Sequence, residues 1–192
     1  AEETLDIYAP LAGRMGMQLM RDELEDISFR VLNPDAFKTI KDRLDRLHKE
    51  SGDILVEIAK ALKARLAEQE IFAEVYGREK RPYSIWRKME KKHLSLGQLS
   101  DIFGFRVIVP SADDCYRALG AIHQTWRAVP GRFKDYITTP KQNDYQSLHT
   151  TVIGPYHMRV EMQIRTVSMH DIAERGIAAH AAYKETRSAP EA

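Results

Sequence analysis

Apolar residues recur at three- and four-residue steps through the first third of the chain, which is the spacing of one buried helix face. Between residues 34 and 66 these positions are Ile40, Leu44, Leu47, Ile54, Leu55, Ile58, Leu62 and Leu66. Asn33 followed by Pro34 is a favoured helix start, because an N-cap side chain precedes a first-turn proline. We therefore expect residues 1 to about 70 to be helical, with Gly52 as only a mild interruption.

After residue 70 the apolar positions form short runs that suit strands, separated by helical segments. Strands are expected at 71–76, 103–109, 134–137, 147–153 and 158–165, and helices at 82–92, 111–126 and 168–184. Gly77 should end the first strand. The alternation predicts an α+β or mixed α/β domain at 71–186, behind a helical lead-in or linker at 1–70 and before a tail at 187–192.

Composition limits the setting but does not identify a ligand. The 192 residues suit one globular domain with a helical appendage. Because 29 Lys and Arg balance 28 Asp and Glu, a basic site must come from local clustering. The lone Cys115 excludes an internal disulfide and indicates a reducing, cytoplasmic location. No stretch approaches the roughly 20 apolar residues of a membrane span, so we expect no membrane association.

Residues 77–93 gather cations around a predicted helix start at Pro82. Backbone N–H groups and the helix dipole would add to the side-chain charge there, which suits a triphosphate. The side chains that could take part are Arg78 and Lys80 before the helix, and Ser84, Lys88 and Lys91 or Lys92 on one of its faces. A solvated basic face is the alternative, and on these residues alone it is favoured. The spacing is not that of a Walker loop.

Two carboxylates lie in or beside predicted strands. Asp101 precedes the buried run at 103–109 and could hold Mg²⁺, although such an Asp more often caps a turn. Glu161, Gln163 and Arg165 alternate along a strand and so share one face. A solvated strand face explains that alternation equally well, and on these residues alone it is favoured.

A polar loop between strands carries amide, aromatic and cationic groups at 132–136 and 141–150. Tyr145 could stack on a base, and Lys141 or His149 could meet phosphate. A simple polar turn is an equal alternative. His170 beside Asp171 is reminiscent of metal-dependent hydrolases, but a second ligand cluster does not accompany this pair in the sequence, which disfavours that interpretation.

Taken in order, these clusters resemble the signature segments of the RelA/SpoT family of (p)ppGpp synthetases. The shared motifs are Arg-x-Lys-(x)3-Ser-Ile, Asp-(x)2-Gly-x-Arg, Arg-Phe-Lys-Asp-Tyr-Ile, Pro-Lys-x-Asn-x-Tyr-Gln-Ser-Leu-His-Thr, Glu-x-Gln-Ile-Arg-Thr and Met-His-x-x-Ala-Glu-x-Gly-x-Ala-Ala-His. The resemblance covers roughly residues 70 to 184. The lead-in resembles the segment that joins hydrolase and synthetase domains in long members of the family.

The resemblance implies a nucleotidyltransferase-like (DNA polymerase beta-like) mixed β-sheet flanked by helices. It implies transfer of pyrophosphate from ATP to the 3′-hydroxyl of GTP or GDP with Mg²⁺ or, alternatively, Mn²⁺. It places Arg78 and Arg106 around adenine, Lys80, Ser84, Lys88 and Lys91 on the ATP phosphates, Asp101 and Glu161 on the metal, Glu161 as general base supported by Gln163, Tyr145 on guanine, and Lys141, Asn143, His149, Arg132 and Lys134 on the acceptor nucleotide.

The segment 132–135 resembles the basic form of a motif that marks bifunctional synthetase-hydrolases, which implies a parent with both activities and a preference for GTP. Asp144 stands where many relatives have glycine, and Asp tolerates turn conformations better than most residues. The hydrolase signature and the C-terminal regulatory domains are not in this chain, and ribosome or tRNA contacts are expected only through such regions. Two rival functions are a regulatory nucleotide-binding module and RNA binding by the basic loop at 78–92.

Overall fold

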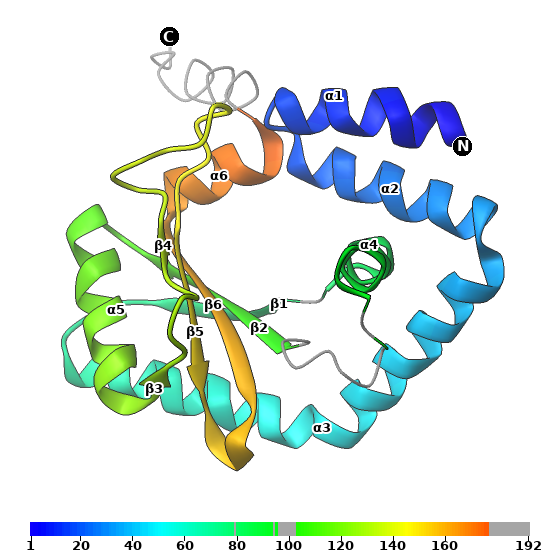
Figure 1. Cartoon of the computed structure of the whole chain (residues 1–192). Coiled ribbons are helices and arrows are strands. Elements are labelled where there is room, and N and C mark those ends of the chain that lie inside the picture. The colour runs from blue at the N-terminus through cyan, green and yellow to red at the C-terminus, as the bar shows by residue number, and fades with distance from the viewer. Residues whose placement is uncertain (79, 94, 96–102, 177–192) are drawn as a thin grey trace, which may run out of the picture.

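The computed structural model describes residues 1–78, 80–93, 95 and 103–176 (Figure 1). Its helices are η1 (Thr4–Tyr8), α1 (Ala9–Arg14), α2 (Gln18–Leu32), α3 (Pro34–Glu68), α4 (Pro82–Lys92), α5 (Ala112–Thr125), η3 (Pro155–His157) and α6 (Val167–Arg175). Its strands are β1 (Glu74–Arg78), β2 (Phe103–Val109), β3 (Arg127–Ala128), β4 (Lys134–Asp135), β5 (Leu148–Ile153) and β6 (Arg159–Thr166).

The prediction that the first 70 residues are helical is confirmed. Helix α3 starts at Pro34, directly after Asn33, and continues through Gly52 to Glu68. Near its start Ile40 and Leu44 pack in a small apolar cluster with α2 and α4. Near its end the helix buries Ile58, Leu62 and Leu66 in the main core against the sheet. One long helix therefore fixes the lead-in relative to the sheet.

The described strands form one mixed sheet in the order β1-β2-β6-β5-β3, with β4 paired to β5. β2 and β6 are parallel, and the other pairs are antiparallel. Figure 1 shows the strands in the centre, α5 and α3 to the left and below, and α6, α2 and α4 above and to the right. The predicted α+β fold, a mixed sheet flanked by helices, is confirmed.

Three predicted segments have different bounds in the structure. β1 starts at Glu74 and includes Gly77, which pairs with Phe105 in the ladder instead of ending the strand. β4 ends at Asp135. Its carboxylate accepts hydrogen bonds from the backbone N–H groups of Ile137 and Thr138, two and three residues later, and so turns the chain. The last helix ends at Arg175, since Gly176 adopts a positive φ of 83°. The rest of the expected helix, 177–184, lies outside the described residues.

The strand register brings distant motifs onto one face of the sheet. Residues directly opposite one another on paired strands point to the same side. The aligned rows are Arg78, Gly104 and Glu161, and next to them Arg106, Gln163 and His149. Val107, Met162 and Ile164 point to the opposite face and are buried in the core.

Among the residues that the structure places, no helix has both the length and the apolar character needed to cross a bilayer.

The main core predicts a clear stability difference between two neighbouring positions of α3. Ile58 is 0% exposed and Val56 is 53% exposed. Ile58→Ala should lower the free energy of unfolding by about 2–5 kcal/mol, because it leaves a cavity between α3 and the sheet. Val56→Ala should change it by less than about 0.5 kcal/mol. Urea denaturation followed by circular dichroism measures both, and equal effects would contradict this core.

Candidate active site

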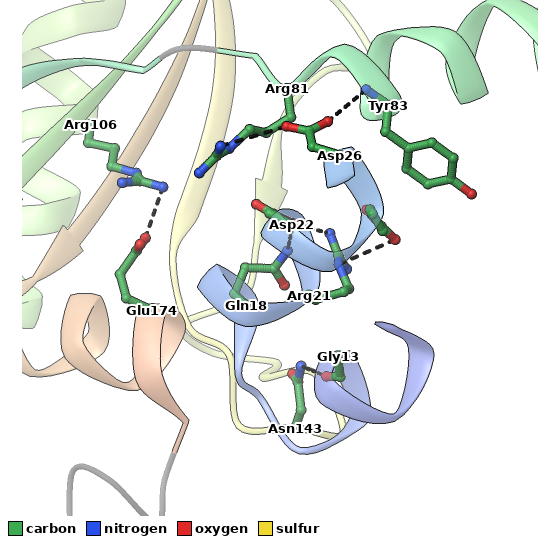
Figure 2. Close-up of polar contacts among 11 residues, drawn as sticks. Gly13, Gln18, Arg21, Asp22, Asp26, Arg81, Tyr83, Arg106, Asn143 and Glu174 are labelled. Atoms are coloured by element: carbon green, nitrogen blue, oxygen red, sulfur yellow. Dashed lines mark hydrogen bonds and ion pairs between the residues drawn. The ribbon is translucent and has the colours of Figure 1, made fainter. Parts of the chain in front are cut away.

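A cavity of about 710 Å³ opens over the polar face of the sheet, enclosed by α4, α2 and the loop before β5. Figure 2 shows α2 side chains between the start of α4 and Asn143, opposite Arg106 and Glu174. The lining residues include eight Lys and Arg side chains but only three Asp and Glu. Such a surplus of cations around a concave site favours polyanionic ligands.

Helix α4 presents the first group of predicted residues. Ser84 and Lys88, one helical turn apart, both line the cavity. The Asp26 carboxylate on α2 accepts a hydrogen bond of 3.0 Å from the backbone N–H of Tyr83, in the first turn of α4 (Figure 2). The lead-in thus caps and orients the helix that carries these side chains.

Glu161 lies beside two cations on the sheet face. Its Oε2 is 3.3 Å from the Lys80 ammonium and 3.6 Å from the Arg78 guanidinium. Burial alone would raise the pKa of Glu161, but Lys80 and Arg78 outweigh it and the pKa is lowered. The carboxylate is therefore ionised at neutral pH.

Gly104 lies between these residues in the sheet. A Cβ at this position would lie 3.3 Å from the Glu161 carbonyl oxygen and 3.6 Å from the Arg78 Cβ, so glycine lets these strands approach closely.

The loop before β5 forms an aromatic pocket around an ammonium group. The Lys141 Nζ lies 4.7 Å from the ring centroid of Tyr136 and 4.6 Å from that of Tyr145. The Tyr145 hydroxyl and the His149 Nε2 are 2.7 Å apart, within hydrogen-bond distance. Asp144 has a φ of 55°, the left-handed conformation that Asp tolerates. These contacts bring together the residues predicted for the acceptor nucleotide.

Burial also shifts the pKa values of this pocket. The pKa of His149 is lowered to about 4, first by burial, and the Glu161 charge opposes the shift only in part. The pKa of Lys141 is lowered by burial and by the charge of Arg21 on α2. His149 is therefore neutral at physiological pH.

Glu174 on α6 organises a second charged group that sequence reasoning missed. Its Oε1 is 2.8 Å from the Arg106 guanidinium and 3.2 Å from that of Arg165 (Figure 2 shows the first pair), with the His170 Nδ1 at 3.9 Å. Within the described residues the buried Nε atoms of Arg106 and Arg165 have no hydrogen-bond partner. The carboxylate thus holds Arg106 at the cavity wall.

The cavity brings together eleven predicted residues: Arg78, Lys80, Ser84, Lys88, Arg106, Lys141, Asn143, Tyr145, His149, Glu161 and Gln163. Lys91, Arg132 and Lys134 are exposed and do not line it. Asp101 lies outside the described residues. The alternative of a solvated strand face is wrong, since Gln163 is 6% and Arg165 1% exposed.

Sequence reasoning also missed the contribution of α2, which lines the cavity with Gln18, Leu19, Arg21 and Asp22. Their sequence carries no motif, because their role depends on tertiary packing. Arg165 and Glu174 did lie in recognised motifs, but their ion pair depends on how α6 packs against β6.

The described side chains of the cavity could hold a cation such as Mg²⁺ only together with phosphate oxygens of a bound nucleotide. In the part of the chain that the structure describes, no three His, Cys, Asp or Glu side chains gather closely enough to hold a metal ion. Glu161 supplies one ionised carboxylate, 22% exposed, at the cavity wall. One or two carboxylates plus phosphate oxygens are the usual ligands of Mg²⁺ in nucleotide sites, so Glu161 fits this role.

Comparison with known protein families and with curated proteins finds relatives of this chain. A family model described as a region found in RelA/SpoT proteins matches residues 77–188. The GTP pyrophosphokinase rsh of Brucella melitensis is 59% identical over 98% of this chain and 25% of its own length. A guanosine-3′,5′-bis(diphosphate) 3′-pyrophosphohydrolase of Haemophilus influenzae is 46% identical over 96% of this chain and 27% of its own length. The chain thus spans about a quarter of the length of these relatives.

Solved structures support the fold. The small alarmone synthetase 1 of Bacillus subtilis is 27% identical, with a TM-score of 0.57 over 78% of this chain and 83% of that one. The same synthetase bound to its product pppGpp is 26% identical, with a TM-score of 0.56 over 78% of this chain and 84% of that one.

The shifted pKa of His149 gives a measurable prediction. In the unfolded chain the His149 imidazole takes up a proton as the pH falls through 6.5, but in the folded protein it does so only near pH 4. The free energy of unfolding that neutral His149 contributes is therefore complete above pH 6.5 and lost between 6.5 and about 4. An NMR titration, with His149→Gln to assign the resonance, should give a pKa near 4, and a value near 6.5 would contradict the partly buried Tyr145–His149 pair.

Proposed function

Because the chain belongs to the RelA/SpoT family, we propose that it is a GTP/GDP pyrophosphokinase, an alarmone synthetase that makes pppGpp or ppGpp and AMP. The observation that carries this proposal is the single cavity in which an ionised carboxylate, Glu161, lies between a cationic wall and an aromatic pocket. Group transfer between two nucleotides requires that both are held with their reacting groups beside a base, and this cavity offers two binding surfaces with a carboxylate between them.

ATP would occupy the cationic wall. Lys80, Ser84 and Lys88 would bind its phosphates at the first turns of α4, where the helix dipole adds to their charge. Arg78 and Arg106 would flank the adenine, since planar guanidinium groups stack on aromatic rings. Arg106 is held at the wall by Glu174, and Gly104 leaves room beside Arg78. Exposed Lys91 could reach the phosphates only from the edge.

GTP or GDP would occupy the aromatic pocket. Tyr145 offers a ring for stacking on guanine, with Lys141, Asn143 and His149 around it. The Lys141 ammonium lies over the face of the Tyr145 ring. It would have to move from this face toward phosphate for guanine to stack there. Arg132 and Lys134 are exposed and would act as long-range cations at the entrance.

In the reaction the acceptor 3′-hydroxyl attacks the β-phosphorus of ATP, the bond between that phosphorus and the oxygen of the α-phosphate breaks, and AMP leaves. Glu161 would accept the hydroxyl proton, with Gln163 beside it on the same strand face. Lys80 would turn from Glu161 to the phosphates and Arg78 to the adenine, which frees the carboxylate. Mg²⁺ or Mn²⁺, held by Glu161 and Asp101, would supply charge neutralisation at the phosphate oxygens.

We also propose that the domain works in the cytoplasm inside a longer bifunctional chain that prefers GTP, beside a hydrolase and regulatory domains. The support is the quarter-length match to relatives named for synthesis and for hydrolysis. The lone buried Cys115 is consistent with a reducing compartment. A full-length parent that makes the alarmone but cannot hydrolyse it would contradict this assignment.

Glu161→Gln tests the proposed base. It keeps the size of the side chain but cannot accept the proton, so the turnover rate should fall by about 10²- to 10⁴-fold while ATP binding persists. Chromatography of AMP and guanosine polyphosphates measures turnover, and calorimetry measures ATP affinity. Glu57→Gln, at an exposed position of α3, is the matched control and should be fully active.

Near-normal turnover of Glu161→Gln would remove this residue from its role. Tight nucleotide binding by the unmodified chain, without AMP formation, would favour a regulatory nucleotide-binding module instead.

A further inference from the structure

The turn between α1 and α2, residues 15–17, makes close backbone contacts with Gly176, after α6, and with Asn143, in the loop before β5. A Cβ on Gly176, which follows α6, would lie 2.8 Å from the Met15 carbonyl oxygen. A Cβ on Gly16 would lie 3.3 Å from the Gly176 Cα and 3.5 Å from the Asn143 carbonyl oxygen. Both glycines have positive φ, 76° and 83°. Three backbone segments therefore meet where only glycine fits.

One amide side chain connects this turn to the acceptor loop, residues 141–145. The Asn143 Nδ2 donates a hydrogen bond of 3.1 Å to the Gly13 carbonyl oxygen, and its Oδ1 accepts one of 3.3 Å from the Tyr145 backbone N–H. Figure 2 shows the first contact at the bottom of the view, near the N-terminal end of α2, whereas Arg81 and Tyr83 lie at the top. A chain of hydrogen bonds thus runs from α1 through Asn143 to the residue that forms the aromatic platform.

The two partners of Asn143 are themselves fixed. The Gly13 carbonyl also accepts the Gly16 N–H at 3.2 Å, and the Met17 N–H bonds to the Ala12 carbonyl at 2.9 Å. In the loop, the Asp144 N–H bonds to the Lys141 carbonyl at 2.9 Å, and the Lys141 N–H to the Tyr145 carbonyl at 3.2 Å. One amide side chain thus joins two turns that are each closed by their own backbone hydrogen bonds.

We propose that the α1–α2 turn is a positioning element of the acceptor-nucleotide site: through Gly13 and Asn143 it holds the 141–145 loop with Tyr145 facing the cavity. The term acceptor rests on the proposed function above. The turn lies before the matched family segment, residues 77–188, so the catalytic region alone would lack this support. On the donor side, α4 is capped by Asp26, in the second half of α2, and Arg106 is held by Glu174, so neither contact uses the Asn143 bond.

Two variants perturb the junction in different ways. Gly16→Ala pushes the turn away from Gly176 and Asn143 by a few tenths of an ångström, which weakens the Asn143 bond. Asn143→Asp keeps the acceptor for the Tyr145 N–H but loses the donor to Gly13. Gly131→Ala is the matched control, because Gly131 has a similar φ of 71° and nothing within 4 Å of its added Cβ.

Steady-state kinetics with GTP and ATP varied separately, combined with hydrogen–deuterium exchange, test the proposal. The KM for GTP should rise severalfold in Gly16→Ala, which leaves the side chains of the acceptor site unchanged. It should rise about tenfold or more in Asn143→Asp, which loses the bond to Gly13 and also changes a side chain proposed to contact the nucleotide, while the KM for ATP stays unchanged. Exchange in 141–146 of the nucleotide-free protein should quicken in both variants but not in Gly131→Ala.

An unchanged KM for GTP in folded Gly16→Ala, or equal rises for both substrates, would overturn the positioning role. If the unmodified chain makes no AMP, the proposed function fails, but the exchange of the 141–146 segment still decides whether the turn holds the loop: unchanged exchange in Gly16→Ala and Asn143→Asp would overturn it.

Discussion

The parallel pairing of β2 with β6 is the constraint on which the site depends. Its register sets Gly104 beside Glu161 and Arg106 beside Gln163, while the alternate residues of the same strands, such as Val107 and Met162, form the core. A slip of one residue would bury Glu161 and expose Met162. The hydrophobic energy that fixes the core therefore also fixes the positions of the reacting side chains.

Around these two strands, two carboxylates of the cavity each pair with two of its cations. Glu161 pairs with Lys80 and Arg78, and Glu174 pairs with Arg106 and Arg165. Breaking a partly buried ion pair is costly unless a new partner takes over. Phosphate oxygens can replace the Glu161 carboxylate at Lys80, and the adenine ring can take up Arg78, so nucleotide binding would activate Glu161 by removing its partners.

The local elements could be predicted closely from the sequence. The bounds of α4 and β2, and the start of α3 after Asn33, match because capping and periodicity are encoded within a few residues. Gly77 was misjudged, since its place in β1 is decided by pairing with Phe105. Family motifs identified most of the cavity lining. The roles of Arg21, Asp26 and Glu174 could not be predicted, because tertiary packing alone brings α2 and α6 to the site.

The most direct test of the account follows the β-phosphorus of ATP. The purified chain would be incubated with GTP, Mg²⁺ and ATP labelled at that phosphorus, and the products separated by chromatography. Transfer of an intact pyrophosphate predicts labelled guanosine pentaphosphate and an equal amount of unlabelled AMP. Label that stays in ATP or appears in ADP or inorganic phosphate, with nucleotide bound and no AMP formed, would contradict the assignment of this cavity as a pyrophosphate-transfer site.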